Sequence, residues 1–494
     1  MSYLQNRASG ILMHISSLPG ETGIGTLGKQ AYSFVDMLSA NNQTYWQMLP
    51  ICPTGFGDSP YQSFSTAAGN PYFIDFEELV KDDYIECSDY KLINWGSDER
   101  RADYGLLYQN RRKVFNIIEE NFFLNVPNDY ESFCSKNADW LDDYATFMAI
   151  KDKYNGAPLS RWEDGLKLRE KQTLLEFKNG HEKEISYYKM LQYLFFMQWN
   201  KLKKYANEKG IKIIGDLPIY VSGDSADVWA SPANFLLNGN LKPLEVAGCP
   251  PDSFSANGQL WGNPVYNWKH LKSTNYEWWQ KRLERSLKTY DIIRIDHFRG
   301  FESFYCIPAE NTTAAGGIWR PGPGMDFFEA TGILKKPVIA EDLGFLTESV
   351  RQLLKETGFP GMNVLQFAFD TRDENDYFPE NYIANSVVYT GTHDNDTILG
   401  WTTSAPQADV LSALKYFSLT STEKLRKSMM KAALESASNT CILTMQDIIG
   451  SKECFRMNTP SSQSGNWQWR ATNQDLLDAD WNWLKDATKK SGRA

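Results

Sequence analysis

The chain has 494 residues, of which 51 are basic and 61 acidic, so its formal net charge at neutral pH is -10. This acidic balance repels nucleic-acid phosphates and anionic lipid headgroups, and no Lys/Arg-rich run offsets it, so we expect neither nucleic acid nor a membrane as a partner. A hydrophobic content of 42% with 23% charged residues is typical of a globular protein and excludes disorder and collagen-like repeats.

The cysteines and the first residues of the chain indicate the compartment. The seven cysteines are odd in number and scattered, with no C-x-x-C pair, so neither a disulfide framework nor a zinc site is expected. Residues 1–20 lack a basic segment followed by an apolar one, and no stretch approaches the roughly 18 apolar residues of a membrane span. We therefore expect a cytoplasmic protein.

Short apolar runs alternate with helical stretches along the chain, as in a parallel α/β sheet. Eight runs are predicted strands: Ile11–Ile15, Tyr45–Pro50, Ile211–Asp216, Ile292–Asp296, Val338–Glu341, Met362–Phe369, Val387–Thr390 and Cys441–Met445. Strands buried on both faces are continuous apolar runs, and eight of them with crossover helices close into a TIM, or (β/α)8, barrel. The predicted fold class is therefore an α/β TIM barrel.

The uneven spacing of these runs predicts insertions. About 160 residues separate the second run from the third, and about 75 separate the third from the fourth, whereas a βα loop usually has roughly 2 to 6 residues. We interpret 1–494 as a single barrel domain with a helical insertion at about 80–190. A second, Gly-, Asn-, Pro- and Ser-rich insertion at about 220–270 is predicted to be irregular and to lie over the barrel mouth.

Capping patterns predict two of the crossover helices. Thr274-x-x-Glu277 opens an amphipathic run that ends near Tyr290, just before the fourth strand. Thr347 is predicted to cap a helix that Gly358 stops.

The segment Gly23–Gly28 fits the pattern G-x-G-x-x-G, so nucleotide binding has to be considered. A P-loop requires Ser or Thr after its lysine, but Gln30 follows Lys29, and the acidic residue that a dinucleotide site needs about 20 positions on is missing. A tight turn into a helix beginning near Leu27 accounts for these glycines, and no cofactor is expected.

Three carboxylates at strand ends carry the strongest chemical signal. Asp296 closes the fourth strand, Glu341 closes the fifth, and Asp394 follows the seventh. In a barrel all three meet at the C-terminal mouth, where such enzymes do their chemistry. Helix capping explains a single acid at such a junction better than it explains three.

Three carboxylates without a metal cluster or a nucleophilic serine motif point to glycoside chemistry, in which one carboxylate attacks the anomeric carbon and one carboxylic acid protonates the leaving oxygen. Strand alternation turns Arg294 and Asp296 to the same side, where Arg294 would keep Asp296 ionised as a nucleophile. Glu341 needs the opposite, a raised pKa. His297 and His393 beside the acids are either hydroxyl donors or structural residues.

Aromatic and amide side chains gather in loops expected near this mouth. The chain has 16 Trp, 25 Tyr and 27 Phe, and flat apolar faces with polar edges suit sugar rings, although a large core also uses them. The loops are residues 59–62 after the second strand, 254–263 in the second insertion, and 458–467 after the eighth strand. Together they predict an oligosaccharide groove.

With these motifs the sequence resembles the amylomaltase family, the 4-α-glucanotransferases or disproportionating enzymes of the α-amylase clan, over nearly its whole length. The motifs that carry the resemblance are Gly10–His14, Gly57–Gln62, Gly69–Pro71, Gly215–Tyr220, Leu260–Pro264, Arg294–Gly300, Ala340–Gly344 and Gly391–Asp394. The resemblance implies a barrel with inserted subdomains, no separate C-terminal β-domain, no calcium site and no appended starch-binding module.

The resemblance also implies residue roles. Asp296 would be the nucleophile of a retaining double displacement through a glucosyl-Asp intermediate, Glu341 the general acid/base and Asp394 the transition-state stabiliser. Tyr61, Asp216, Arg294 and His393 would line the sugar site at the cleaved bond. Further implied glucan contacts are Ser59, Phe254, Gln259, Trp261, Asp370, Asn466 and Trp467. Where the family often has an acidic residue near Phe254, this chain reads Ser255-Ala256-Asn257.

The implied activity is transfer of α-1,4-glucan segments from a donor to the 4-hydroxyl of an acceptor glucan or glucose. Implied substrates are maltooligosaccharides, amylose and α-glucans derived from starch or glycogen. A plain α-glucan hydrolase and a non-catalytic oligosaccharide-binding protein are the alternatives. Transfer and hydrolysis share one covalent intermediate, so the carboxylates alone do not separate them.

Overall fold

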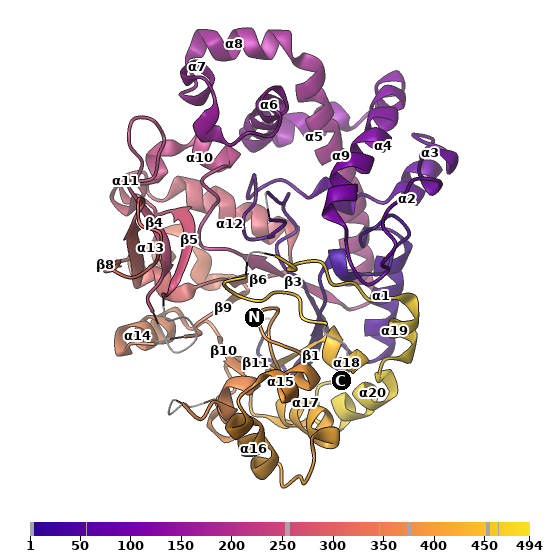
Figure 1. Ribbon diagram of the computed structural model, residues 1–494, viewed down its shortest axis with the longest axis vertical. Coiled ribbons are helices and arrows are strands. Elements are labelled where there is room, and N and C mark those ends of the chain that lie inside the picture. The colour runs from indigo at the N-terminus through magenta and orange to yellow at the C-terminus, as the bar shows by residue number, and fades with distance from the viewer. Residues whose placement is uncertain are drawn as a thin grey trace.

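Eight parallel strands form the centre of the protein, in a computed structural model that describes residues 4–55, 57–251, 257–344, 346–372, 377–450, 455–462 and 464–494 (Figure 1). The strands are β1 (Ala8–Leu12), β2 (Tyr45–Gln47), β3 (Lys212–Leu217), β6 (Ile292–Ile295), β9 (Val338–Ala340), β10 (Gly361–Val364), β11 (Ser386–Tyr389) and β12 (Thr440–Thr444). Their order is β10-β11-β12-β1-β2-β3-β6-β9, and each laddered pair is parallel. All eight overlap the predicted runs, so the predicted barrel is confirmed.

The barrel closes where β9 meets β10. Ala340 N donates to Pro360 O at 3.0 Å, and Met362 N donates to the Asp342 carboxylate at 2.7 Å. In a regular parallel ladder a backbone carbonyl of β9 would accept the hydrogen bond from β10, but here the Asp342 side chain accepts it. This seam lies directly beside Glu341, at the mouth of the barrel.

Several strands end earlier than the apolar runs predicted, and β2, for example, ends at Gln47 rather than at Pro50. β1 ends at Leu12, and Ile15–Ser17 forms the 3-10 helix η1; β10 ends at Val364, and Leu365–Phe369 forms the 3-10 helix η7. β12 ends at Thr444, which caps helix α18 (Met445–Ile449). Each run stays apolar because the turn after the strand is buried too, so hydrophobicity did not mark the strand end.

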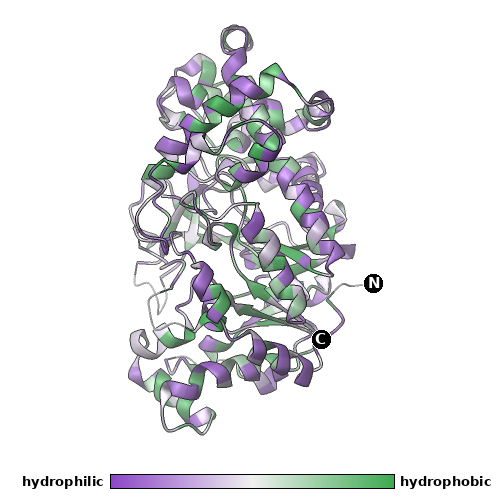
Figure 2. Ribbon diagram, turned by 90° about the vertical axis from the view of Figure 1, so that its right-hand side faces the viewer, coloured by the Kyte–Doolittle hydropathy of each residue, from purple (hydrophilic) through white to green (hydrophobic). Residues whose placement is uncertain are grey.

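Helices surround the strands, and Figure 2 shows green, hydrophobic strands at the centre with mixed green and purple helices around them. Such helices bury one apolar face against the sheet. They are α1 (Lys29–Ala40), α12 (Glu277–Thr289), α13 (Met325–Thr331), α14 (Glu348–Thr357), α15 (Ile398–Ser404), α16 (Gln407–Tyr416), α17 (Leu425–Glu435), α18, α19 (Asn473–Asp478) and α20 (Trp481–Lys490). After β12, the described chain forms only helices and loops.

One predicted helix start is confirmed and another is wrong. The Thr347 side chain accepts from Val350 N at 3.4 Å, and Gly358 ends α14 in the left-handed conformation. Thr274 instead ends helix α11 (Trp268–Ser273), donating to His270 O and Leu271 O. Because Asn275 and Tyr276 are both left-handed, α12 begins only at Glu277.

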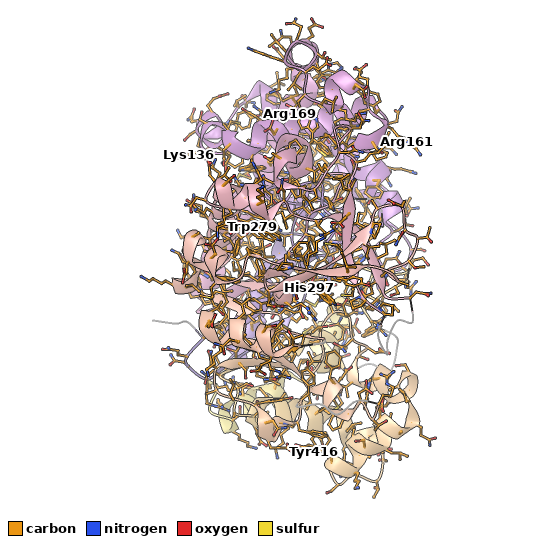
Figure 3. All side chains as sticks on the ribbon, turned by 90° about the vertical axis from the view of Figure 1, so that its left-hand side faces the viewer. Lys136, Arg161, Arg169, Trp279, His297 and Tyr416 are labelled. Atoms are coloured by element: carbon orange, nitrogen blue, oxygen red, sulfur yellow. The ribbon has the colours of Figure 1, made fainter. Side chains whose placement is uncertain are left out.

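Helices dominate the first long insertion: α2 (Phe76–Lys81), α3 (Ser88–Lys91), α4 (Tyr104–Leu124), α5 (Tyr130–Lys136), α6 (Ala138–Lys153), α7 (Asp164–Lys167), α8 (Lys171–Gly180) and α9 (Glu182–Glu208). Several of them gather at one end of the molecule (Figure 1). α9 also reaches the barrel layer, where Trp199 Nε1 donates to Thr289 O at 3.1 Å. Figure 3 labels Lys136, Arg161 and Arg169 towards this end, Tyr416 at the other, and His297 between them.

The second insertion is less irregular than predicted. Besides α10 (Ala226–Ala230) and α11, it contains β4 (Glu245–Cys249) and β5 (Gln259–Pro264). These strands pair with β7 (Ser303–Pro308) and β8 (Ile318–Pro321) in an antiparallel sheet of order β5-β4-β7-β8. The prediction missed this sheet because half of it lies beyond β6, in a βα loop that was not recognised as an insertion.

Two general features concern membranes and thiols. Within the described residues, no helix has both the length and the apolar character that crossing a bilayer requires. No disulfide joins the six cysteines of the described part of the chain.

Candidate active site

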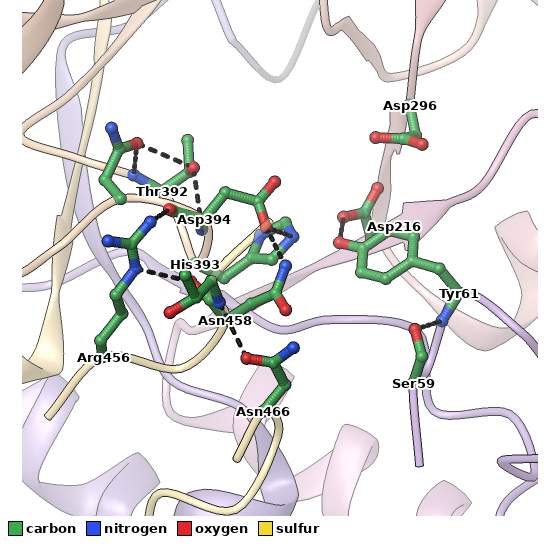
Figure 4. A network of polar contacts seen from close by, with 12 residues as sticks. Ser59, Tyr61, Asp216, Asp296, Thr392, His393, Asp394, Arg456, Asn458 and Asn466 are labelled. Carbon is green, nitrogen blue, oxygen red and sulfur yellow. Dashed lines mark hydrogen bonds and ion pairs between the residues drawn. The ribbon is translucent and has the colours of Figure 1, made fainter. Parts of the chain in front are cut away.

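The barrel brings five of the predicted site side chains to one mouth. Asp216 lies near the end of β3, Asp296 directly follows β6, Glu341 directly follows β9, and Asp394 lies in the loop after β11. Tyr61, from the loop after β2, hydrogen-bonds across to Asp216. The carboxyl ends of parallel barrel strands share one face, which explains why residues so distant in sequence meet. Figure 4 shows Tyr61, Asp216 and Asp296 grouped opposite His393 and Asp394.

Arg294 connects two of these carboxylates. Its Nη1 donates to Asp216 at 2.6 and 2.5 Å and lies 3.2 Å from Asp296 Oδ1. The Tyr61 hydroxyl donates to Asp216 Oδ2 at 2.7 Å. Arg294 and Asp216 are both about 4% exposed, so this ion pair is shielded from water. Burial, together with Asp216, raises the pKa of Tyr61 well above its usual value, which keeps the phenol a donor.

Asp296 is less easily ionised than the sequence suggested. Burial raises the pKa of Asp296 to about 7, although Arg294 acts in the opposite direction. The neighbouring carboxylates of Asp216 and Asp394 add to the rise. The predicted Arg294–Asp296 contact is therefore present, but it offsets only part of the cost of burying the negative charge.

Glu341 is held by two backbone amides. His297 N donates to one carboxyl oxygen at 2.6 Å and Leu343 N to the other at 2.9 Å. Burial raises the pKa of Glu341 to about 8, against the pull of Arg294 and of these two donors. His297 is left-handed, with φ 50° and ψ 52°, which places the backbone N–H after Asp296 on the Glu341 carboxyl.

Asp394 differs from the other acids because its side chain is 46% exposed. Its Oδ1 accepts from Asn458 Nδ2 at 2.6 Å and lies 3.3 Å from His393 Nε2 (Figure 4). Burial lowers the pKa of His393, which favours the neutral imidazole, although Asp394 acts in the opposite direction. Its ring stacks on Tyr61 with a centroid distance of 5.2 Å, and Trp467 lies 5.8 Å from Tyr61.

The second insertion reaches the same region through Trp261. Its ring lies 4.9 Å from the His297 ring in a T-shaped arrangement, and its Nε1 donates to Gln259 Oε1 at 3.0 Å. Gln62 Nε2 donates to Asn263 Oδ1 at 2.8 Å, which joins the loop after β2 to β5. The small antiparallel sheet therefore presents Trp261 beside the residue that follows Asp296.

Three further predicted contacts, Ser59, Asp370 and Asn466, lie in segments that follow barrel strands. The Ser59 hydroxyl accepts from Tyr61 N at 3.2 Å, and Asn466 Oδ1 accepts from Thr459 N at 2.9 Å. Asp370 ends η7 and forms an ion pair with Arg372 at 2.6 Å. Phe254, Ser255 and Ala256 lie outside the described residues.

Two polar contacts at the site were not predicted. Arg456 donates to the backbone oxygen of Asp394 at 2.6 Å, and Asp342 bridges the barrel seam beside Glu341. Arg456 stands two positions before Asn458 in a loop already predicted to overhang the mouth, which is the only sequence signal for it. In the described part of the chain, no group of three His, Cys, Asp or Glu side chains is placed to hold a metal ion.

Comparison with known proteins gives consistent results. A family described as 4-alpha-glucanotransferase matches residues 13–475. The 4-alpha-glucanotransferase of Clostridium butyricum is 45% identical over 97% of this chain and 100% of its own, and that of Streptococcus pneumoniae is 45% identical over 98% and 97%. The solved structure of amylomaltase from Streptococcus agalactiae in complex with acarbose has a TM-score of 0.96 and 41% identity, and the match covers 99% of this chain and 100% of that one.

Proposed function

Because the chain belongs to the 4-alpha-glucanotransferase family, a family of transferases acting on α-1,4-glucans, we propose that it moves glucan segments by a retaining double displacement at the Asp296–Glu341 pair. The observation that carries this proposal is that the two acids have different charged neighbours. Arg294 lies 3.2 Å from Asp296, whereas in the described structure Glu341 forms no ion pair with a basic side chain. Asp296 therefore loses its proton more readily than Glu341, with a pKa of about 7 against about 8.

In the first step, an Asp296 carboxylate oxygen attacks the anomeric carbon and the glycosidic bond breaks. The leaving oxygen takes the Glu341 proton, so the departing segment leaves as a neutral alcohol. Positive charge develops on the sugar ring, and the Asp394 carboxylate stabilises it electrostatically. The product is a β-linked glucosyl ester on Asp296.

In the second step, the 4-hydroxyl of an acceptor glucan attacks the same carbon. Its proton passes to the Glu341 carboxylate, the bond to Asp296 breaks, and both acids return to their starting states. Two inversions at one carbon retain the α configuration. The His297 and Leu343 amides support this role, because they stabilise the Glu341 carboxylate that has to exist between the two steps.

The sugar at the cleaved bond would contact Tyr61, Asp216, Arg294 and His393. The buried Tyr61–Asp216–Arg294 network supports this assignment, since it presents fixed donors and acceptors to ring hydroxyls. Neighbouring sugars would contact Ser59, Gln259, Trp261, Asp370, Asn466 and Trp467, with Phe254 assigned from the sequence alone.

Transfer rather than hydrolysis is attributed to Trp261 and its surroundings. An acceptor glucose stacked on this indole would hold its hydroxyl against the intermediate, and effective molarities of oriented groups reach about 10⁵ M or more, against about 55 M for water. The T-shaped contact with His297 at 4.9 Å supports this placement, because His297 directly follows the nucleophile. Two alternatives to transfer remain: hydrolysis of the intermediate by water, and a protein that binds oligosaccharides without cleaving them.

Further parts of the proposal concern partners, place and organisation. Maltooligosaccharides, amylose and starch- or glycogen-derived glucans are proposed donors, and glucose an acceptor. The cytoplasm is the proposed compartment, supported by six described cysteines without a disulfide. We assign 1–494 to one catalytic domain with insertions at about 80–190 and 220–270.

Incubation of the protein with maltotriose, with products resolved by size, tests this function. A transferase makes oligosaccharides longer than maltotriose together with glucose, and the total of reducing ends stays constant. A hydrolase makes glucose and maltose with a rise in reducing ends. No product at all would favour the binding protein.

A further inference from the structure

Asp394 is the one acid of the three whose position the protein core does not fix. Its side chain is 46% exposed, compared with 26% for Asp296. A half-exposed aspartate can populate more than one rotamer, yet electrostatic stabilisation of a transition state requires a carboxylate already fixed in place. Something other than burial therefore has to hold it.

Contacts from the loop after β12 act on both the side chain and the backbone of Asp394 (Figure 4). Asn458 Nδ2 donates to Asp394 Oδ1 at 2.6 Å, and Arg456 Nη2 donates to Asp394 O at 2.6 Å. Arg456 Nε also donates to Asn458 O at 2.7 Å, and Asn458 N donates to His393 O at 3.1 Å. Three hydrogen bonds thus join residues 456–458 to residues 393–394, and the Arg456–Asn458 bond lies within the loop itself.

The same loop carries glucan contacts proposed above. Thr459 N donates to Asn466 Oδ1 at 2.9 Å, and Trp467 N donates to Met457 O at 2.8 Å. The Trp467 ring lies 5.9 Å from that of His393. One short stretch, 456–459, therefore touches the acid on one side and the sugar-contacting residues on the other.

We propose that Asn458 and Arg456 are positioning residues that hold Asp394 in its transition-state geometry. Asn458 fixes the carboxylate through Oδ1 and leaves the second oxygen for the developing positive charge, while Arg456 fixes the backbone that carries it. The inference rests on the stabilising role assigned to Asp394 in the proposed function. Transition-state stabilisation then depends on a loop that also contacts the substrate.

Two substitutions at position 458 separate positioning from simple loop support. Asn458→Ala removes the donor, and Asn458→Asp keeps the shape but puts a second negative charge beside Asp394. Loss of a hydrogen bond to a charged group corresponds to a fall in kcat of about 10- to 100-fold for Asn458→Ala, with KM little changed. Asn458→Asp should lose more than Asn458→Ala. If the loop merely needs support, the isosteric Asp variant should instead be the more active one.

The assay measures kcat and KM with maltotriose and with α-glucosyl fluoride, which needs no protonation to leave. Both donors should be affected, because Asp394 acts on the charge of the ring and not on proton transfer. Asn385→Ala is the matched control: this exposed asparagine also donates through Nδ2, to Gly358 O at 3.1 Å, and it precedes β11 at the end opposite Asp394. Melting temperature is recorded for every variant.

Asp394→Asn distinguishes failure of this inference from failure of the proposed function. If Asp394→Asn keeps parent activity, the role of Asp394 itself is wrong. If Asp394→Asn has a strongly lowered but measurable kcat while Asn458→Ala matches Asn385→Ala, only the positioning role is wrong. The inference predicts that adding Asn458→Ala to Asp394→Asn lowers kcat no further. A multiplicative further loss would overturn it.

Discussion

Replacing Arg294 should raise the pKa of Asp296 and thereby slow formation of the glucosyl intermediate. Arg294 is the cation in contact with Asp296, at 3.2 Å, and it also pairs with Asp216, whose side chain is 1% exposed. Removing the arginine alone would leave Asp216 charged, buried and unpaired, at a cost of about 3–5 kcal/mol in stability. The informative comparison is therefore Arg294→Leu with Asp216→Asn, measured against Asp216→Asn alone.

The size of the effect follows from the pKa of Asp296, which is about 7 in the parent protein. In Asp216→Asn it starts no higher, because the Asp216 charge also raises it, so working from 7 gives the upper limit of the effect. An opposite charge this close lowers a carboxyl pKa by about 1 to 3, so its loss should move the pKa of Asp296 to between about 8 and 10. The ionised fraction at pH 7 then falls from about one half to between about one tenth and one thousandth. We expect a fall of roughly 5- to 500-fold in the rate of fluoride release from α-glucosyl fluoride.

The pH dependence tests the cause. A nucleophilic Asp296 has to be ionised, so a raised pKa should lower activity at pH 7 and let it recover as the pH rises towards 10. The fluoride donor needs no acid, so deprotonation of Glu341 above about pH 8 does not hide the recovery. Arg294→Lys, which keeps the charge, should shift the profile less. A loss that is equal at every pH from about 6 to 10 would refute the reasoning.

Four further predictions concern other parts of the molecule. Trp261→Ala should lower the ratio of new oligosaccharide to new reducing ends from maltotriose by about 2- to 10-fold, which corresponds to the free energy of one aromatic stacking contact. An unchanged ratio with lower total activity would contradict the role assigned to Trp261. Gly361→Ala should slow maltotriose cleavage, which needs the Glu341 proton, more than fluoride release, which does not. The reason is that the added Cβ would lie 2.7 Å from the Asp342 carboxylate, directly beside Glu341. Equal slowing of the two reactions would contradict this prediction. Arg493→Ala should lower the free energy of unfolding in urea by about 2–4 kcal/mol, because this buried guanidinium donates to five backbone carbonyls. A loss under about 0.5 kcal/mol would show that water takes over the hydrogen bonds to these carbonyls. Activity should persist in excess chelator, and loss that calcium restores would show a metal requirement.

The barrel was predictable because its signals are local in sequence. Val387 and Val388, for example, belong to a short apolar run that is fully buried in β11. The acids were predictable for a related reason: a residue directly after such a strand lies at the mouth whatever the rest of the chain does. Asp296 and Glu341 both occupy that position.

Features that depend on distant partners were not predictable. β4 and β5 are short and each contains a glycine. β5 pairs with β4, and β4 pairs in turn with β7, which lies beyond β6. The pKa of Asp296 depends on burial by several elements together, so the Arg294 spacing could suggest the contact but not its net effect. The Asn458–Asp394 bond joins residues 64 positions apart, and neither flanking sequence indicates it.

The most direct test of the double displacement is capture of the covalent intermediate. Glu341→Gln should still react with α-glucosyl fluoride, and because the second step then lacks its base, the glucosyl ester should accumulate. Digestion and mass spectrometry should find one glucosyl group on Asp296, and the variant that also carries Asp296→Ala should show none. Fluoride release with no adduct, or a glucosyl group on another residue, would contradict the assignment of Asp296 as the nucleophile.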